Sequence, residues 1–357
     1  MKQHIGKIIN FVLIFGTLLV VLLVGLNGQE LGNALEAMRS LGVGYVALCT
    51  GCYLLHGASD AVSLWYFLRR QGCHVSFLYM LFVANAGLYY SNITPGASGG
   101  QPMQIYYLHK KGVPIGLASS ALVVRFFSFQ FMLSVFGTVL WIRYGAFIAQ
   151  QIGDYKWILI AGYVYNLILV TFLLMLAFTK GIVRFFIRLF VSVGQRLRIV
   201  KDAAASTAKW EASLDTFSKS MSMLRHRPKD VAVQLLLGAV QLLSLMAVLY
   251  FIYLGLGMHG TGFGEIIAMH VMEYLSAAYI PSPGASGMQE VTFSLYFSGI
   301  FPGEGLRLAA LLLWRFFTYY LSLLLGAVIT VAYGWRVGQD RKAVLTEASD
   351  MQRGMRS

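Results

Sequence analysis

The chain has 357 residues, of which 57% are hydrophobic and 12% are charged, and its mean hydropathy is +0.66. This composition excludes a soluble globular domain and predicts several membrane-spanning helices of about 20 residues each. The formal net charge is +13. Because the basic residues cluster between the apolar runs, this charge indicates membrane orientation by the positive-inside rule rather than nucleic-acid binding.

The first apolar run covers about residues 8–26 and follows Lys2 and Lys7. It is long for a signal-peptide core and lacks a small-residue cleavage site, so we predict an uncleaved span that starts in the cytoplasm. A second span over residues 45–68 ends at two arginines, residues 69–70. The positive-inside rule places these arginines in the cytoplasm.

The chain then re-enters the membrane, meets a polar, glycine-rich break and emerges at Lys110 and Lys111. Because both ends of this excursion are basic, we predict a re-entrant hairpin over residues 77–108 that enters and leaves on the cytoplasmic side. Two full spans follow, over residues 115–141 and 157–178, the first running outward and the second returning.

The segment 179–230 is predicted to be cytoplasmic. Residues 180–230 contain eleven Lys or Arg and four acidic residues, which satisfies the positive-inside rule. Apolar side chains within it form one helical stripe opposite charged ones: Trp210, Leu214, Phe217, Met221 and Leu224. Such an amphipathic helix is expected to lie on the anionic membrane surface or to pack on the inner face of the protein.

The rest of the chain reads as a span over residues 231–254, a second excursion over residues 265–301 and a last span over residues 306–333. Nearly uncharged loops flank the second excursion, so we expect a hairpin entered from outside. A basic tail, residues 334–357, then ends in the cytoplasm with the N-terminus. The total is six full spans and two hairpins. A competing interpretation makes each hairpin arm a full span, although about fourteen apolar residues are few for that.

Two glycine-rich breaks indicate that the chain is duplicated. Residues 95–101 read Pro-Gly-Ala-Ser-Gly-Gly-Gln, and residues 283–289, 188 positions later, read Pro-Gly-Ala-Ser-Gly-Met-Gln. Downstream, Arg125-Phe-Phe-Ser recurs as Arg315-Phe-Phe-Thr with two residues inserted. Duplicated hydrophobic units interrupted at corresponding positions are typical of transporters, and the interruptions point to the binding site.

The repeated unit is span–hairpin–span, over residues 45–141 and again over residues 231–333. The predicted threading gives the two units opposite orientations. We therefore predict an all-α polytopic membrane protein, a single transmembrane domain built as an inverted-topology repeat with two re-entrant hairpins.

Each break predicts a polar cavity near the membrane centre, because unwound backbone persists in a bilayer only where protein or water surrounds it. The outgoing helices are expected to start near Gly100 and Met288, with unpaired N–H groups and positive dipole ends toward the cavity. Two such ends would favour a phosphate. Ser98 and Ser286 are expected to cap these helices or to touch ligand, and capping is the favoured role.

Arg125 and Arg315 lie at matched positions in the spans after the hairpins. A charge at that depth costs roughly 2.5–3.5 kcal/mol, so it faces a partner or a cavity. Phosphate binding and an ion pair with an acid such as Glu290 or Asp60 are equally good interpretations. The candidate substrate-binding set joins these residues to polar and glycine positions of the breaks and their arms: Arg125, Arg315, Glu290, Glu273, Asp60, Asn92, Thr94, Ser98, Gly99, Gly100, Gln101, Ser286, Gly287 and Gln289.

No metal site, cofactor or catalytic residue is predicted. His270 and Glu273 have the i, i+3 spacing of two ligands, but one such pair is weak evidence and a hydrogen bond between them is favoured. Because nucleotide-binding and hydrolase motifs are missing from the sequence, we do not expect an enzyme.

The break motifs resemble a known family. Residues 92–102 read Asn-Ile-Thr-Pro-Gly-Ala-Ser-Gly-Gly-Gln-Pro, and residues 281–290 read Pro-Ser-Pro-Gly-Ala-Ser-Gly-Met-Gln-Glu. They resemble the flippase-like family, also called the lysylphosphatidylglycerol synthase transmembrane region, the membrane half of the multiple peptide resistance factor. The resemblance covers about residues 5–333. It implies a bacterial inner-membrane protein that moves a lipid between leaflets, in that family aminoacylated phosphatidylglycerol.

One departure from that family concerns the end of the chain. Only a short basic tail follows residue 333. We therefore expect no aminoacyl-transferase domain, and a separate lipid-modifying synthase becomes a candidate partner. A membrane phospholipid is the expected substrate, and nucleic acid is not an expected partner.

Lipid translocation is the leading hypothesis. The lipid phosphate would contact the two arginines and the helix ends, acids would meet a cationic headgroup, and rocking of the repeats would open the cavity to each leaflet in turn. The second hypothesis is an ion-coupled carrier of a small anion, with Asp60 or Glu273 as a proton or sodium site. An intramembrane enzyme acting on a lipid phosphate and a scaffold are the others. The headgroup, direction, energy source and oligomeric state, including a homo-oligomer, are left open.

Overall fold

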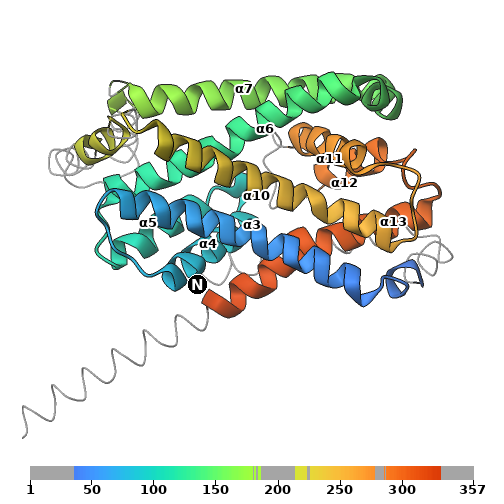
Figure 1. The fold of residues 1–357 in the computed structure, drawn as a ribbon, viewed down its shortest axis with the longest axis horizontal. Coiled ribbons are helices and arrows are strands. Elements are labelled where there is room, and N and C mark those ends of the chain that lie inside the picture. Colours follow the sequence, from blue (N-terminus) through green and yellow to red (C-terminus); the bar gives the residue numbers. More distant parts are fainter. Residues whose placement is uncertain are drawn as a thin grey trace, which may run out of the picture.

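The computed structural model describes residues 36–179, 181, 184–185, 214–222, 226–277, 285 and 287–330. Every regular element in these ranges is helical, which confirms the predicted all-α class (Figure 1). Three stretches are long and apolar enough to cross a membrane, residues 115–175, 228–255 and 304–330. The predicted first span and the basic tail lie outside the described residues.

Two long helices form the centre of the fold. Helix α3 covers Val43–Arg70 and α10 covers Pro228–Gly255, and they pack along one another across the molecule (Figure 1). Their seam is polar in places, since the Ser63 hydroxyl donates to Gln234 Oε1 at 2.5 Å. Helix α3 is long enough to span a bilayer, but polar residues such as Asp60 lower its hydropathy below that of the three apolar stretches.

The first excursion is a helical hairpin. Helix α4 covers Phe77–Asn92, a 3₁₀ turn covers Pro95–Ala97 and α5 covers Gly100–Lys110. The two helices pack against each other so closely that a Cβ on Gly100 would overlap the Ser91 hydroxyl. Two packed helices with a break at the proline-glycine motif are therefore present. Their re-entrant course through a membrane stays a prediction.

Helix α6 covers Ile115–Ile152, longer than the predicted span, and carries a kink at Tyr144. The prediction ended this span at residue 141, but the backbone stays helical up to the 3₁₀ turn Gly153–Tyr155, whose first residue has a φ of 55°. Helix α7, Lys156–Phe178, then packs back on α6 and forms one edge of the molecule (Figure 1). It carries exposed apolar side chains, as expected of a lipid-facing helix.

The second half contains α11 (Phe263–Ala277), α12 (Met288–Tyr296) and α13 (Glu304–Arg315). A π-helical turn, Phe316–Tyr320, follows α13, and the helix then continues to residue 330. Helices α11 and α12 pack together, so the second excursion also has two packed arms. In Figure 1 the α4–α5 hairpin lies toward the left and α11 and α12 toward the right. The inverted relation of the two halves stays a prediction.

The apolar core has two parts. One is built mainly from α10, α11, α12 and α13, and the other from α3, α4, α5 and the start of α6. Leu214, Phe217 and Met221 of the predicted amphipathic helix belong to the second part, at 3%, 7% and 2% exposure. Of the two predicted locations for this helix, the described part therefore packs on the protein. Trp210 and Leu224 lie outside the described residues.

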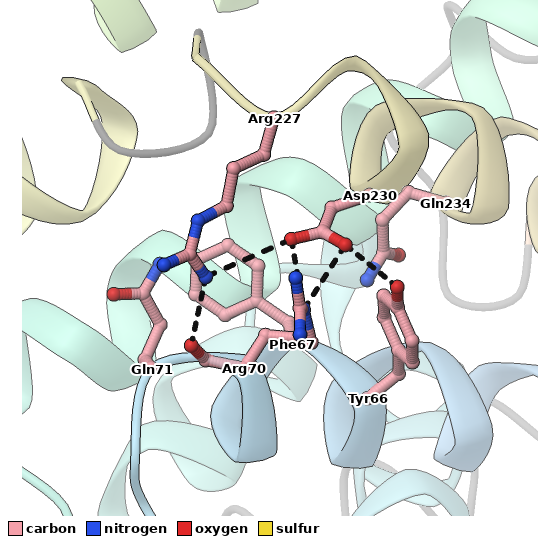
Figure 2. Close-up of a pocket in the computed structure, with 7 residues that line it drawn as sticks. All are labelled: Tyr66, Phe67, Arg70, Gln71, Arg227, Asp230 and Gln234. Atoms are coloured by element: carbon pink, nitrogen blue, oxygen red, sulfur yellow. Dashed lines mark hydrogen bonds and ion pairs between the residues drawn. The ribbon is translucent and has the colours of Figure 1, made fainter.

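A charged cluster joins the end of α3 to the start of α10 (Figure 2). The Asp230 carboxylate accepts hydrogen bonds from the Tyr66 hydroxyl at 2.7 Å and from Arg70 Nε at 3.0 Å. Arg227 Nη1 lies 3.9 Å from the same carboxylate and donates to the Arg70 carbonyl oxygen. The basic end of α3 and the end of the basic segment 179–230 thus lie side by side.

Candidate functional site

A cavity of about 500 Å³ is lined by residues from both halves of the chain. This volume falls in the usual range of small-molecule sites. Residues of α3, α6, α7 and α10 line it, together with both breaks and the helix that continues from α13. Five of the predicted site residues line it: Asn92, Gln101, Arg125, Gln289 and Arg315. The structure therefore brings together arginines that are far apart in the sequence.

Both breaks border this cavity, and each places an alanine in the left-handed region of backbone conformation. Ala97 and Ala285, 188 positions apart, both line it and have φ angles of 55° and 51°. Left-handed alanines are uncommon, and such strained residues cluster at functional sites. The second residue of each outgoing helix, Gln101 in α5 and Gln289 in α12, also lines the cavity. The predicted helix starts are confirmed, and the positive ends of both dipoles border the cavity.

Arg125 is paired and faces the cavity at the same time. Its Nη1 donates to Asp60 Oδ1, which also accepts from Gln241 Nε2 at 3.1 Å. Asp60 is fully buried and does not line the cavity, whereas Arg125 does. Asp60 Oδ2 and Arg125 Nε have no hydrogen-bond partner among the described residues. The two interpretations of Arg125 are therefore compatible, with Asp60 behind the guanidinium and the cavity beside it.

Arg315 has its own carboxylate. Its Nε lies 2.8 Å from Glu290 Oε1, and its Nη1 donates to Gln289 Oε1 at 2.5 Å. The guanidinium lies 4.6 Å from the centre of the Tyr319 ring, within cation–π range. Glu290 Oε2 accepts from the backbone N–H of Gly287 at 2.6 Å. Glu290 thus fixes the start of α12 and orients Arg315.

Glu273 is buried behind the cavity wall. It is fully buried, and its Oε1 accepts from the Thr292 hydroxyl at 2.9 Å. His270 and Tyr274, its neighbours along α11, line the cavity. The predicted hydrogen bond between His270 and Glu273 is wrong, because His270 Nδ1 donates instead to the Met246 carbonyl oxygen at 3.0 Å. The described part of the chain holds no group of three potential metal ligands.

The remaining polar positions of the first break are structural. Ser98 is exposed and α5 has no side-chain cap, so the predicted capping role is wrong. The Thr94 hydroxyl instead accepts from the backbone N–H of Gly99 at 2.8 Å and donates to the Tyr90 carbonyl oxygen. Gly99 and Gly100 are required by close packing of the hairpin, where a Cβ would meet Thr94 and Ser91. Ser286 lies outside the described residues.

Several cavity residues were not predicted, among them Ser322 and Tyr319, which both bond to the predicted residue Asn92. The Asn92 amide donates to the Ser322 hydroxyl, and the Tyr319 hydroxyl donates to the Asn92 carbonyl oxygen at 3.4 Å. These bonds tie the first hairpin to the helix that continues from α13. Gln130 and Gln241 also line the cavity, and their polarity inside apolar helices was a usable signal. Tyrosines inside such helices gave no signal of a binding site, because aromatic residues are common there.

The known proteins that this chain is similar to are membrane proteins. The family described as "Lysylphosphatidylglycerol synthase TM region" matches residues 8–326, a range that includes both breaks and both arginines. A protein from Archaeoglobus fulgidus, named "UPF0104 membrane protein", is 24% identical over 273 residues, which cover 72% of this chain and 76% of that protein. The chain is a membrane protein that belongs to the family of the lysylphosphatidylglycerol synthase TM region.

Proposed function

We propose that this protein moves a phospholipid, or a related lipid phosphate, between the leaflets of a bacterial inner membrane. One observation carries the proposal: a single cavity is bordered by both repeat arginines and by the second residue of each of two short helices. The family to which the chain belongs supports a membrane-lipid role.

The cavity supplies the donors that a phosphate requires. Guanidinium groups bind phosphate oxygens through paired N–H donors, and helix N-termini add partial positive charge. Arg125 and Arg315 line the cavity, while Asp60 and Glu290 are not among the residues that line it. Because each arginine already holds a carboxylate, the pairs are close to neutral. A headgroup with both a phosphate and an amine leaves this balance unchanged, which favours zwitterionic or aminoacylated lipids.

The helix lengths support two re-entrant hairpins. Helices α4, α5, α11 and α12 have 16, 11, 15 and 9 residues. At 1.5 Å per residue these arms reach roughly 14–24 Å, less than the hydrocarbon thickness of about 30 Å. Hairpins of this length end within the membrane, so the cavity at their tips would be accessible to each leaflet when the two halves rock.

The rest of the lining is amphipathic, which suits a lipid. Amide and hydroxyl side chains line the cavity together with apolar and aromatic ones. The apolar and aromatic residues include Leu88, Phe126, Phe129, Leu169 and Leu245. A headgroup would occupy the polar part while the acyl chains stay in the bilayer. An ion-coupled carrier of a small soluble anion is the second candidate, favoured by the same arginines, because inorganic phosphate offers them the same oxygens.

Lipid movement in reconstituted vesicles tests the proposal. Fluorescent lipids with several headgroups are followed with a reagent that quenches only the outer leaflet. We expect movement by the wild type and at least a tenfold lower rate for the Arg125→Gln, Arg315→Gln variant. The control is Arg143→Gln, an exposed α6 arginine that does not line the cavity. A correctly folded wild type that moves no labelled lipid would refute the proposal, and uptake of phosphate ions by the same vesicles would favour the carrier.

A further inference from the structure

We propose that Glu273 is a proton-binding site and that lipid movement is coupled to proton binding there. The coupling rests on the proposed lipid function, whereas the proton site is a property of the protein alone. Four features of the structure carry this inference: the burial of Glu273, the single proton of its hydroxyl partner, the charges around it and its lack of an ionisable counterpart in the first half.

The Glu273 carboxyl is buried with one oxygen unused. The residue is fully buried near the C-terminal end of α11, and its Oε2 has no hydrogen-bond partner among the described residues. Burying an ionised carboxylate with an empty acceptor is costly, and a neutral carboxyl group costs much less. The surroundings of Glu273 therefore suit a carboxyl group that holds a proton.

The partner hydroxyl accommodates both protonation states. Thr292 has one hydroxyl proton but three acceptors in range: Glu273 Oε1 at 2.9 Å, the Met288 carbonyl oxygen at 2.8 Å and the Gln289 carbonyl oxygen at 3.3 Å. Threonine hydroxyls in helices commonly donate to the carbonyl oxygen four residues earlier. When Thr292 does so, its lone pair faces Glu273, and only a protonated carboxyl can donate to it. When Glu273 is ionised, the Thr292 proton turns toward it.

The charges near Glu273 do not balance if every acid is ionised. Arg315 of α13 and Glu290 of α12 interact electrostatically with Glu273, and Arg315 is already paired with Glu290. One arginine thus serves two carboxylates, and the group is neutral when Glu273 carries a proton. Of the described charged and titratable groups, Arg315, Glu290 and, on α11 itself, Tyr274 interact electrostatically with Glu273. His270, one turn earlier on α11, is bonded to the Met246 carbonyl oxygen of α10.

The first half has no equivalent acid. The residue 188 positions before Glu273 is Asn85, whose amide donates to the Leu81 carbonyl oxygen at 2.8 Å. Arginines and glutamines match between the halves at the cavity, but this ionisable side chain occurs in the second half alone. A single proton site in one half gives a repeat transporter a means of coupling that the symmetric residues cannot supply.

Lipid and proton are expected to bind together. A lipid phosphate that contacts Arg315 competes with Glu290 and adds negative charge near Glu273, which favours the proton on Glu273. Thermodynamic linkage requires the reverse as well, so a proton on Glu273 tightens lipid binding. Glu273 takes up a proton from the aqueous phase on one side of the membrane when the lipid binds. It releases the proton to the aqueous phase on the other side when the lipid is released. Affinity for an anionic lipid is then expected to rise as the pH falls, up to about tenfold per pH unit for one linked proton.

Infrared spectroscopy of the purified protein tests the proton site without any lipid transport. We expect the carbonyl stretch of a protonated carboxyl group in the wild type, its loss in Glu273→Gln and its persistence in Glu304→Gln. Glu304 is the matched control because it is exposed at the start of α13. Thr292→Val retains the carboxyl and removes its partner, so the band should shift rather than disappear. A band unchanged in both Glu273→Gln and Thr292→Val would overturn the proton site.

An imposed pH gradient across vesicles tests the coupling. We expect the gradient to change the rate of lipid movement severalfold in the wild type and in Glu304→Gln, and to have no effect in Glu273→Gln. A gradient response that survives in Glu273→Gln would overturn the coupling. If no lipid moves but the infrared band depends on Glu273, the lipid function fails and the proton site stands. If lipid moves with neither a gradient response nor the band, the proton site fails and the lipid function stands.

Discussion

The Arg125–Asp60 ion pair separates a structural role of Arg125 from a binding role. Asp60 is fully buried and the Arg125 side chain is 14% exposed. Asp60→Asn keeps the shape of the side chain but leaves the arginine without its counter-charge. Removing one partner of a buried pair costs roughly 3–5 kcal/mol. At about 1.4 kcal/mol per factor of ten, the folding equilibrium constant falls roughly 100- to 3000-fold.

The matched control removes both charges. In the double variant Asp60→Asn, Arg125→Gln no buried charge is left unpaired, and replacing a complete buried pair is often close to neutral for stability. We therefore expect the double variant to recover most of the thermal stability that Asp60→Asn loses. If Arg125 serves only to pair with Asp60, the double variant also moves lipid at the wild-type rate. If Arg125 binds the lipid phosphate, the rate stays low.

Lipid-dependent thermal unfolding completes the test. Asp60→Asn frees the guanidinium, which lines the cavity, for another anion. A short-chain phosphatidylglycerol should raise the melting temperature of Asp60→Asn more than that of the wild type, and a neutral detergent of similar chain length should raise both equally. The reasoning is refuted if Asp60→Asn melts at the wild-type temperature, or if the double variant is as unstable as the single one.

Three other predictions concern packing and can be measured by thermal unfolding in detergent. Gly162→Ala should lose about 1–3 kcal/mol, because a Cβ there would overlap a carbonyl oxygen of α11, whereas Gly51→Ala, with no neighbour within 4 Å, should be neutral or gain up to about 1 kcal/mol. Phe217→Ala should lose about 3 kcal/mol if its helix packs on the protein as described, and no loss would place that helix on the membrane instead. Asp230→Asn should lose about 1–2 kcal/mol, and the loss should shrink in high salt because its main arginine partner is half-exposed.

The position of the cavity could be predicted from the sequence. A proline followed by several glycines strongly disfavours a continuous helix, so the breaks could be located without a structure. The 188-residue spacing then paired the breaks and the arginines, and the helix starts at Gly100 and Met288 followed from the same motifs. These features depend on local backbone chemistry and on duplication, which a single sequence records directly.

Glu290 and Asp60 were predicted as candidate ion-pair acids, but the sequence did not show which arginine each of them would pair with. Arg125 pairs with an acid from α3, and Arg315 pairs with an acid from α12, so no common spacing predicts both. Which acid reaches which arginine is decided by how the helices pack. The same reason explains His270, whose partner is a carbonyl oxygen of α10. The absence of a Ser98 cap on α5 likewise depends on the turn geometry, which brings Thr94 rather than Ser98 to the N–H of Gly99.

The two acids belong to different helices, so we expect the two arginines to respond differently when the halves of the protein move. Asp60 and Gln241, which hold Arg125, belong to the packed pair α3 and α10, so Arg125 is fixed to the centre of the fold. Glu290, which holds Arg315, belongs to the second hairpin itself and also fixes the start of α12. If the second hairpin moves during the proposed lipid movement, we expect it to act directly on Arg315 and to leave Arg125 in place. The buried carboxyl of Glu273 lies in that same hairpin, so we expect proton binding to act where the cavity changes shape.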